Sequence, residues 1–150
     1  GQSLWLREIA GREDGAPPPV DLPAERAVGD FVRNQILAGA VRACHDVSDG
    51  GILVAIAEMC IASGIGARLA THPRDIPGHA FWFGEDQGRY LVAVPDGAAF
   101  IRAAEVANVP AMRIATSGGQ DLTLPDGGTI SVKALRDAHE RFFPAWMDGG

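Results

Sequence analysis

The sequence has few cysteines and fewer basic than acidic residues. Its two cysteines, Cys44 and Cys60, do not have the spacing of a zinc site and fall in segments predicted to be buried, as is typical of core thiols in a reducing compartment. Thirteen Lys and Arg against nineteen Asp and Glu give a formal net charge of -6. This balance argues against a general surface for nucleic acid or anionic membranes, but it is compatible with a local phosphate pocket.

The sequence also lacks an apolar run long enough to cross a membrane. Its longest apolar stretch, residues 50–62, is interrupted by Glu58 and falls short of the roughly 20 residues that a span requires. Arg7 and Glu8 stand where a secretory signal would be apolar. We therefore expect a cytoplasmic protein. The chain begins without Met, which is consistent with an excised fragment.

No internal repeat or low-complexity tract is visible, and 150 residues fit one domain with a substantial core. Apolar spacing predicts helices over residues 3–10, 21–39, 52–62, 98–108 and from 131 onward. The expected N-caps are Ser3, Asp21, Asp96 and Ser131. Strands are expected over residues 41–44, 65–70, 90–94, 111–116, 121–124 and 129–132, and the Pro-Asp-Gly-Gly sequence between the last two predicts a hairpin. The pattern predicts an α+β fold with one mixed, largely antiparallel sheet covered by helices, close to a ferredoxin-like arrangement.

Three further expectations concern individual segments. The Pro-rich residues 12–20 predict an extended connector, and residues 71–80 a loop. Pro144 should kink or end the last helix. The helix over residues 52–62 has almost no polar face, so we expect a second layer or a missing partner domain to cover its other side.

The stretch His-Asp-Val-Ser-Asp-Gly-Gly, residues 45–51, is the strongest candidate for chemistry. It lies where a strand is expected to pass into a helix, whose first turn offers unpaired N–H groups to an anion. Gly50 and Gly51 allow a ligand to approach the main chain. Asp46 and Asp49 can hold Mg²⁺, which usually takes one or two carboxylates together with phosphate oxygens.

A simpler interpretation of the same stretch remains open. Ser48 or Asp49 can be the N-cap of the helix, with the two glycines easing the turn. The stretch is neither a Walker A loop nor a dinucleotide fingerprint, because it lacks the lysine of the first and the glycine spacing of the second. Residues 84–89, polar and bracketed by glycines, can line a cleft or form a solvated turn.

Several motifs, in their order and spacing, resemble the C-terminal domain of phosphoribosylformylglycinamidine synthases, the purine-biosynthesis ligases of the PurL type, in particular the small bacterial form. The resemblance covers essentially the whole chain. It rests on residues 4–8, 15–22, 45–51, 64–67, 83–90, 122–124 and 143–146. It implies a fold like the C-terminal domain of PurM, with residues 1–20 as the helix and linker from a preceding ATP-binding domain and residues 21–150 as the domain proper.

The resemblance also implies an activity for the complete protein. ATP activates formylglycinamide ribonucleotide, and glutamine-derived ammonia displaces phosphate to give formylglycinamidine ribonucleotide, ADP and phosphate. PurS and PurQ subunits are the implied partners, and Mg²⁺ and ATP the implied cofactors. The catalytic residues of the family lie upstream, so none is expected here, and this half of the enzyme would form a pseudo-symmetric, non-catalytic site.

The site residues carried over by the resemblance fall into three sets. Asp49 matches the position of a metal ligand in the family, and Asp46, from its spacing to Asp49, is expected to support it as a second ligand. Cofactor contacts are expected from Ser48, Gly50 and Gly51. Substrate contacts are expected from Gln2, Glu85, Asp86 and Gln87.

Two alternatives stay open at this point. The first is a related ATP-using enzyme, such as a thiamine-monophosphate kinase, a selenophosphate synthetase or a hydrogenase-maturation protein, which shares an Asp-x-Ser-Asp-Gly-like turn. The second is a non-enzymatic module for ligand sensing or oligomerisation on a ferredoxin-like sheet. The connector at residues 12–22 and the motif at residues 84–89 favour the PurL type.

Overall fold

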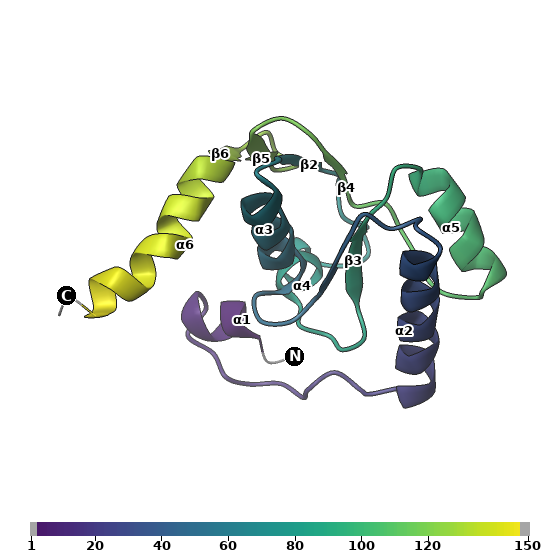
Figure 1. Ribbon diagram of the computed structural model, residues 1–150. Helices are drawn as coiled ribbons and strands as arrows, with labels where there is room; N and C mark the ends of the chain where they lie inside the picture. Colours follow the sequence, from purple (N-terminus) through teal and green to yellow (C-terminus); the bar gives the residue numbers. More distant parts are fainter. Residues whose placement is uncertain (1–2, 148–150) are drawn as a thin grey trace. The chain divides into compact units, whose positions relative to one another are not determined.

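The computed structural model describes residues 3–147 and contains two compact units (Figure 1). The first unit comprises the described part of residues 1–55 together with residues 72–113. The second comprises residues 56–71 and the described part of residues 114–150.

The first unit opens with a capped helix and a connector. Ser3 caps α1 (Leu4–Glu8) by accepting a hydrogen bond from the Leu6 N–H, and residues 11–21 then run without helix or strand. Asp21 caps α2 (Leu22–Leu37) by accepting from the Ala24 N–H, with proline in the first turn where no N–H is needed. The predicted caps and the extended connector are confirmed.

The core of this unit lies between α2, α5 (Gly97–Val106) and β3 (Tyr90–Ala93) (Figure 1). Phe31 of α2 meets Phe100 of α5 edge to face, with ring centroids 5.4 Å apart. Val92 of β3 packs against the same cluster. β1 (Ala43–Asp46) pairs antiparallel with β3, placing Asp46 opposite Tyr90. One end of this ribbon therefore brings residue 46 next to residue 90.

A short helix occupies part of the segment expected to be a loop. α4 (Gly78–Phe83) begins after Pro77 and buries Phe81 and Trp82. The prediction of a loop through residue 80 is therefore wrong at its end. Burying two neighbouring aromatic rings requires tertiary partners, and that requirement is not visible in a glycine- and proline-rich sequence pattern.

α3 (Gly51–Ser63) follows the corner after β1. Ile52, Ala55, Ile56 and Cys60 are buried, whereas Val54 keeps 37% of its surface exposed. The helix is thus not buried on all sides within this chain. The predicted end is confirmed, because Gly64 follows with φ +71°, a conformation that favours glycine.

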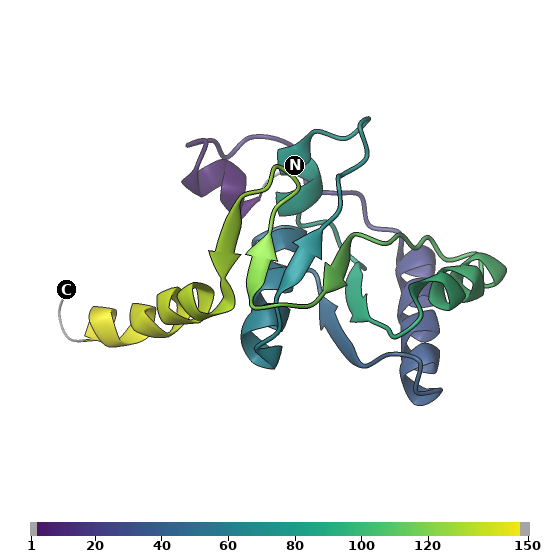
Figure 2. The same ribbon diagram turned by 90° about the horizontal axis from the view of Figure 1, so that it is seen from above.

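The second unit is built on a four-stranded sheet in the order β4-β2-β5-β6, whose arrows lie in a row in Figure 2. Its strands are β2 (Ala67–Leu69), β4 (Ala115–Ser117), β5 (Asp121–Thr123) and β6 (Thr129–Ser131). β2 pairs parallel with β5 and antiparallel with β4, and β5 forms the predicted hairpin with β6.

The last helix of this unit, α6 (Val132–Met147), starts from the sheet. The Ser131 hydroxyl accepts from the Ala134 N–H, as predicted for a cap. Arg136 donates to the Ile61 carbonyl over 2.6 Å and so supplies a donor at the end of α3. The helix does not end at Pro144. Its last turns are exposed, so water can bind the carbonyl that proline leaves without a donor.

The predicted fold class is confirmed, with one difference in how the strands are grouped. The strands are mostly antiparallel and helices accompany them, as expected. However, the described residues form a two-stranded and a four-stranded sheet rather than one sheet. The strand predicted over residues 111–116 is reduced to β4, because strand pairing with β2 involves only residues 115–117.

Candidate functional site

A hollow of about 360 Å³ opens in the first unit at the end of the β1–β3 ribbon. Its walls come from the corner after β1, the loop before β3 and the first half of α2. The lining residues are Glu25, Asp46, Val47, Ser48, Asp49, Glu85, Gln87, Gly88, Arg89 and Tyr90. Segments separated by up to 65 positions in the sequence thus share one concave surface.

Backbone pairing places the two main walls side by side. The ladder between β1 and β3 continues for one more bond, in which the Val47 N–H donates to the Arg89 carbonyl over 2.9 Å. The chain after residue 47 is therefore held against the chain before residue 89. A side chain at Gly88 would clash with Glu25, since a Cβ there would lie 2.6 Å from the Glu25 Cγ. Gly88 allows α2 to approach this loop closely.

The corner itself leaves Ser48 and Asp49 directed to solvent and the hollow. Both residues are exposed and line the hollow. Among residues 3–147, no hydrogen bond joins either side chain to the first turn of α3, as a cap would require. Instead, the Gly50 N–H donates to Glu85 Oε1 over 2.9 Å. A distant carboxylate thus pairs with the N–H of the residue just before α3.

The two glycines of this corner serve the backbone. Gly50 and Gly51 have φ of +81° and +71°, where side chains are strained. A Cβ on Gly51 would lie 2.7 Å from the Gly84 carbonyl oxygen and from the Phe83 carbonyl carbon. Gly51 is buried, and neither glycine lines the hollow. The structure therefore gives both glycines a role in close packing, and their contact with a cofactor stays a prediction.

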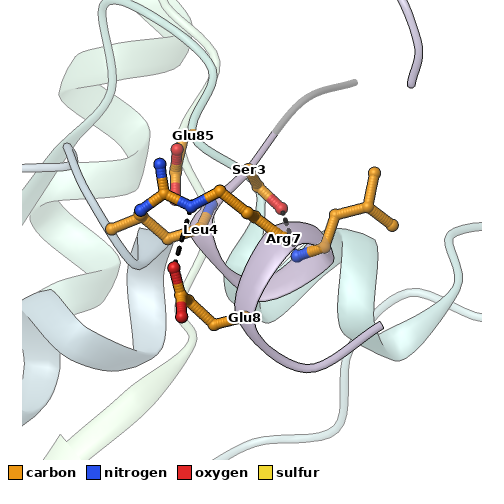
Figure 3. A network of polar contacts seen from close by, with 6 residues as sticks. Ser3, Leu4, Arg7, Glu8 and Glu85 are labelled. Carbon is orange, nitrogen blue, oxygen red and sulfur yellow. Dashed lines mark hydrogen bonds and ion pairs between the residues drawn. The ribbon is translucent and has the colours of Figure 1, made fainter. Parts of the chain in front are cut away.

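Glu85 holds the loop before β3 to two other segments. Its Oε1 accepts from the Leu4 N–H over 2.8 Å as well as from Gly50, and Figure 3 shows the carboxylate beside the start of α1. Arg89 braces the same loop, donating to the Gly84 carbonyl over 2.5 Å and pairing with the Asp86 carboxylate over 3.2 Å. These contacts fix the loop without using the Gln87 side chain.

The electrostatics of the hollow favour cations. Four of the lining residues, Glu25, Asp46, Asp49 and Glu85, carry carboxylates, and Arg89 is the one basic residue among those lining it. Arg89 is already engaged with Gly84 and Asp86. A free phosphate would therefore meet net negative charge and is expected to bind together with a divalent cation.

Asp46 and Asp49 supply hard oxygen donors of the kind that Mg²⁺ takes. Within the described residues, no group of three or more His, Cys, Asp or Glu side chains could hold a metal ion. The donor set thus fits a cation that takes its remaining ligands from water and phosphate. Cys60 is buried as predicted, but Cys44 is exposed, so the prediction of a buried thiol is wrong for Cys44. Desolvation by nearby atoms and then the charge of Asp46 raise the pKa of the Cys44 thiol.

The structure brings together five of the predicted site residues at the hollow, namely Asp46, Ser48, Asp49, Glu85 and Gln87. Asp86 lies in the same loop but does not line the hollow, and Gln2 lies outside the described residues. Sequence reasoning missed Glu25 and Tyr90. The clue for Tyr90 was its place directly after the 84–89 motif, whereas α2 packing alone brings Glu25 to the site.

A family model describes most of the chain. The model for the AIR synthase related protein C-terminal domain matches residues 1–124, which include the whole hollow. In addition, no helix among the described residues is long and apolar enough to cross a membrane.

Relatives match the chain from end to end. The chain is 61% identical over 150 residues to the phosphoribosylformylglycinamidine synthase subunit PurL of Gluconobacter oxydans, with all of this chain and 20% of the relative covered. It is 60% identical over 147 residues to the subunit of the same name from Acidiphilium cryptum, covering 98% of this chain and 20% of the relative. The chain thus spans about a fifth of the length of these relatives.

Solved structures agree on the fold. Thermotoga maritima PurL complexed with ATP superposes with a TM-score of 0.66 at 19% identity, over 79% of this chain and 23% of that one. The same protein complexed with FGAR gives a TM-score of 0.65 at 19% identity, over 78% and 21%. Because the family model spans residues 1–124, the chain belongs to the AIR synthase related proteins as one of their C-terminal domains.

Proposed function

We propose that this chain is the C-terminal domain of a phosphoribosylformylglycinamidine synthase of the PurL type. The observation that carries the proposal is the 61% identity to a PurL subunit over the full length of the chain. Under this proposal, residues 1–20 connect the domain to a preceding ATP-binding domain, and residues 21–150 form the domain proper. The complete protein would be cytoplasmic and would work with PurS and PurQ subunits.

The proposed reaction belongs to the complete protein. It converts formylglycinamide ribonucleotide, glutamine-derived ammonia and ATP to formylglycinamidine ribonucleotide, ADP and phosphate. No catalytic residue is assigned to this chain. Its part is to close one side of a nucleotide cleft, and the 150 residues alone should have no turnover.

The hollow gives this role a physical basis. Mg²⁺ bound there would neutralise phosphate charge, with Asp49 and Asp46 as its protein ligands. Ser48 offers a hydroxyl on the same wall, and Gln87 a neutral amide on the opposite wall. Glu85 and Asp86 hold the loop that carries Gln87. Contacts of Gly50, Gly51 and Gln2 with ligand belong to the same proposal.

A chimera tests the proposal directly. The matching C-terminal fifth of the Gluconobacter oxydans PurL subunit would be replaced by this chain, and ADP and formylglycinamidine ribonucleotide formation would be measured with its PurS and PurQ partners. We expect activity within about tenfold of the parent, because 61% of the matched positions are identical and most substitutions at surface positions change stability little.

Two controls make the chimera decisive. The parent without its C-terminal fifth should be inactive, which shows that the assay depends on this domain. A chimera that is folded, by circular dichroism and elution volume, yet inactive would contradict the proposal. Turnover by the 150 residues alone would contradict the assignment of a closing role.

A further inference from the structure

Glu85 links two segments that are far apart in the sequence. Its Oε1 accepts the N–H of Leu4, 81 residues away, over 2.8 Å and the N–H of Gly50, 35 residues away, over 2.9 Å. Both bonds involve a charged acceptor and are partly buried, which makes them stronger than exposed bonds between neutral groups. One oxygen atom therefore ties the start of α1 to the corner before α3.

The α1 side of this link has its own docking contact. Trp5 stacks on His79 with ring centroids 5.1 Å apart and an interplanar angle of 18°, and on Phe83 at 5.9 Å and 26°. His79 and Phe83 belong to α4, which leads directly into Glu85. Helix α1 has only five residues and is too short to be stable alone, so these contacts must hold it in place.

The corner side of the link is equally constrained. Gly51 packs against the backbone of Phe83 and Gly84, leaving no room for a side chain. Gly50, next to it, gives its N–H to Glu85. Ser48 and Asp49 precede these two residues and line the hollow. Any shift of the 83–85 backbone is therefore expected to move the two polar residues of the corner.

We propose that Glu85 is a positioning residue that couples the docking of α1 to the conformation of the Asp49–Gly50 turn. When α1 is docked, both N–H groups share Oε1 and the turn holds Asp49 at the hollow. When α1 leaves, the loop loses the Trp5 stack and one of its two bonds, and the turn loosens. The consequence for nucleotide binding rests on the proposed function, but the coupling itself does not.

Hydrogen exchange in the complete chimera described above tests the coupling without any ligand. In Glu85→Ala, amide exchange should become about tenfold faster in both peptides, residues 3–9 and residues 47–54, because each loses a bond to a charged acceptor. Glu85→Gln keeps a carbonyl oxygen at the same place, so exchange should return to within about threefold of the parent. Glu8→Ala is the matched control, since among residues 3–147 this α1 carboxylate pairs only with exposed Arg7.

Trp5→Ala then distinguishes two explanations: that Glu85 couples α1 to the Asp49–Gly50 turn, or that its two hydrogen bonds act independently. With Glu85 present, loss of the ring should speed exchange in residues 47–54 by about threefold or more, although Trp5 does not line the hollow. In the Glu85→Ala background the same change should have no further effect on residues 47–54. Equal effects of Trp5→Ala in both backgrounds, or none in either, would overturn the proposal.

The two proposals can fail separately. An inactive chimera in which Glu85→Ala still accelerates both peptides would overturn the function and leave the coupling intact. An active chimera in which Glu85→Ala changes only residues 3–9 would overturn the coupling alone. If Glu85→Ala unfolds the domain, exchange becomes faster everywhere. The coupling is then tested by Trp5→Ala in the parent and in the Glu85→Gln background, and no acceleration of residues 47–54 in either would overturn it.

Discussion

The tripeptide Asp-Gly-Gly occurs twice in the described part of the chain, and its two copies differ in almost every tertiary respect. At residues 49–51 it forms the corner before α3, where Glu85 binds one N–H and the backbone of α4 presses against Gly51. At residues 126–128 it closes the β5–β6 hairpin. The same tripeptide thus makes a constrained corner, with Asp49 at the hollow, in one place and an exposed hairpin turn in the other.

The hairpin copy holds itself together. Asp126 Oδ1 accepts from the Gly128 N–H over 2.9 Å, a local bond that such turns commonly make. Gly127 has φ +91°, and nothing lies within 4 Å of where its Cβ would be. In the corner copy the Asp49 side chain makes no such bond among residues 3–147 and stays available at the hollow. Because Glu85 binds the Gly50 N–H at this corner, the Asp49 carboxylate is left available to a ligand.

The largest expected difference is in the free energy of unfolding when one glycine of each turn is replaced by alanine. Gly51→Ala places a Cβ 2.7 Å from the Phe83 and Gly84 backbone at φ +71°, so it should lower the free energy of unfolding by about 3 kcal/mol or more. Gly127→Ala carries only the conformational cost, about 1 kcal/mol. Urea denaturation of the two variants measures both, and equal losses would contradict the comparison.

The next difference concerns ligand binding. If the proposed function holds, Asp49→Asn in the complete chimera should weaken Mg²⁺-dependent ATP binding at the hollow at least about tenfold, since even groups that only support a metal ligand change affinity by that factor. Asp126→Asn is the matched control and should leave affinity unchanged, because Asp126 belongs to the hairpin. Titration calorimetry with and without Mg²⁺ compares them, and an unchanged Asp49→Asn would refute the metal assignment.

A smaller effect is expected from Arg89, which braces the loop behind the corner at residues 49–51. Arg89→Lys keeps the charge but cannot reproduce the fork that reaches the Gly84 carbonyl and the Asp86 carboxylate. We expect a loss of about 1–2 kcal/mol in the free energy of unfolding. Arg141→Lys, on the exposed face of α6, provides the control and should change stability by less than about 0.5 kcal/mol. Similar losses in both would contradict the bracing role.

The smallest effect is expected at the hairpin. Asp126→Ala removes one exposed hydrogen bond and should lower the free energy of unfolding by about 0.5–1 kcal/mol. Asp126→Asn retains the accepting oxygen and should be nearly neutral. A loss for Asp126→Ala as large as that for Gly51→Ala would show that the hairpin turn depends on more than its local bond.

Local chemistry explains which features were predictable. The caps at Ser3, Asp21, Asp96 and Ser131 depend on side chains three residues or fewer from the N–H they bind, and all four are found. The hairpin at residues 121–131 is equally local and is confirmed. By contrast, neither Ser48 nor Asp49 caps α3 among residues 3–147, and the Gly50 N–H just before this helix donates to Glu85, 35 residues further along the chain.

The α+β class, most helix ends and the family could be read from the sequence, since they follow from capping residues, apolar spacing and motifs along the chain. The sequence also placed Asp46, Ser48 and Asp49 together, because they are neighbours. Folding was needed to bring Glu25 and Tyr90 to them, to pack Gly51 against the 83–84 backbone and to place Glu85 beside two distant amides. Those outcomes depend on long-range packing, which no local pattern encodes.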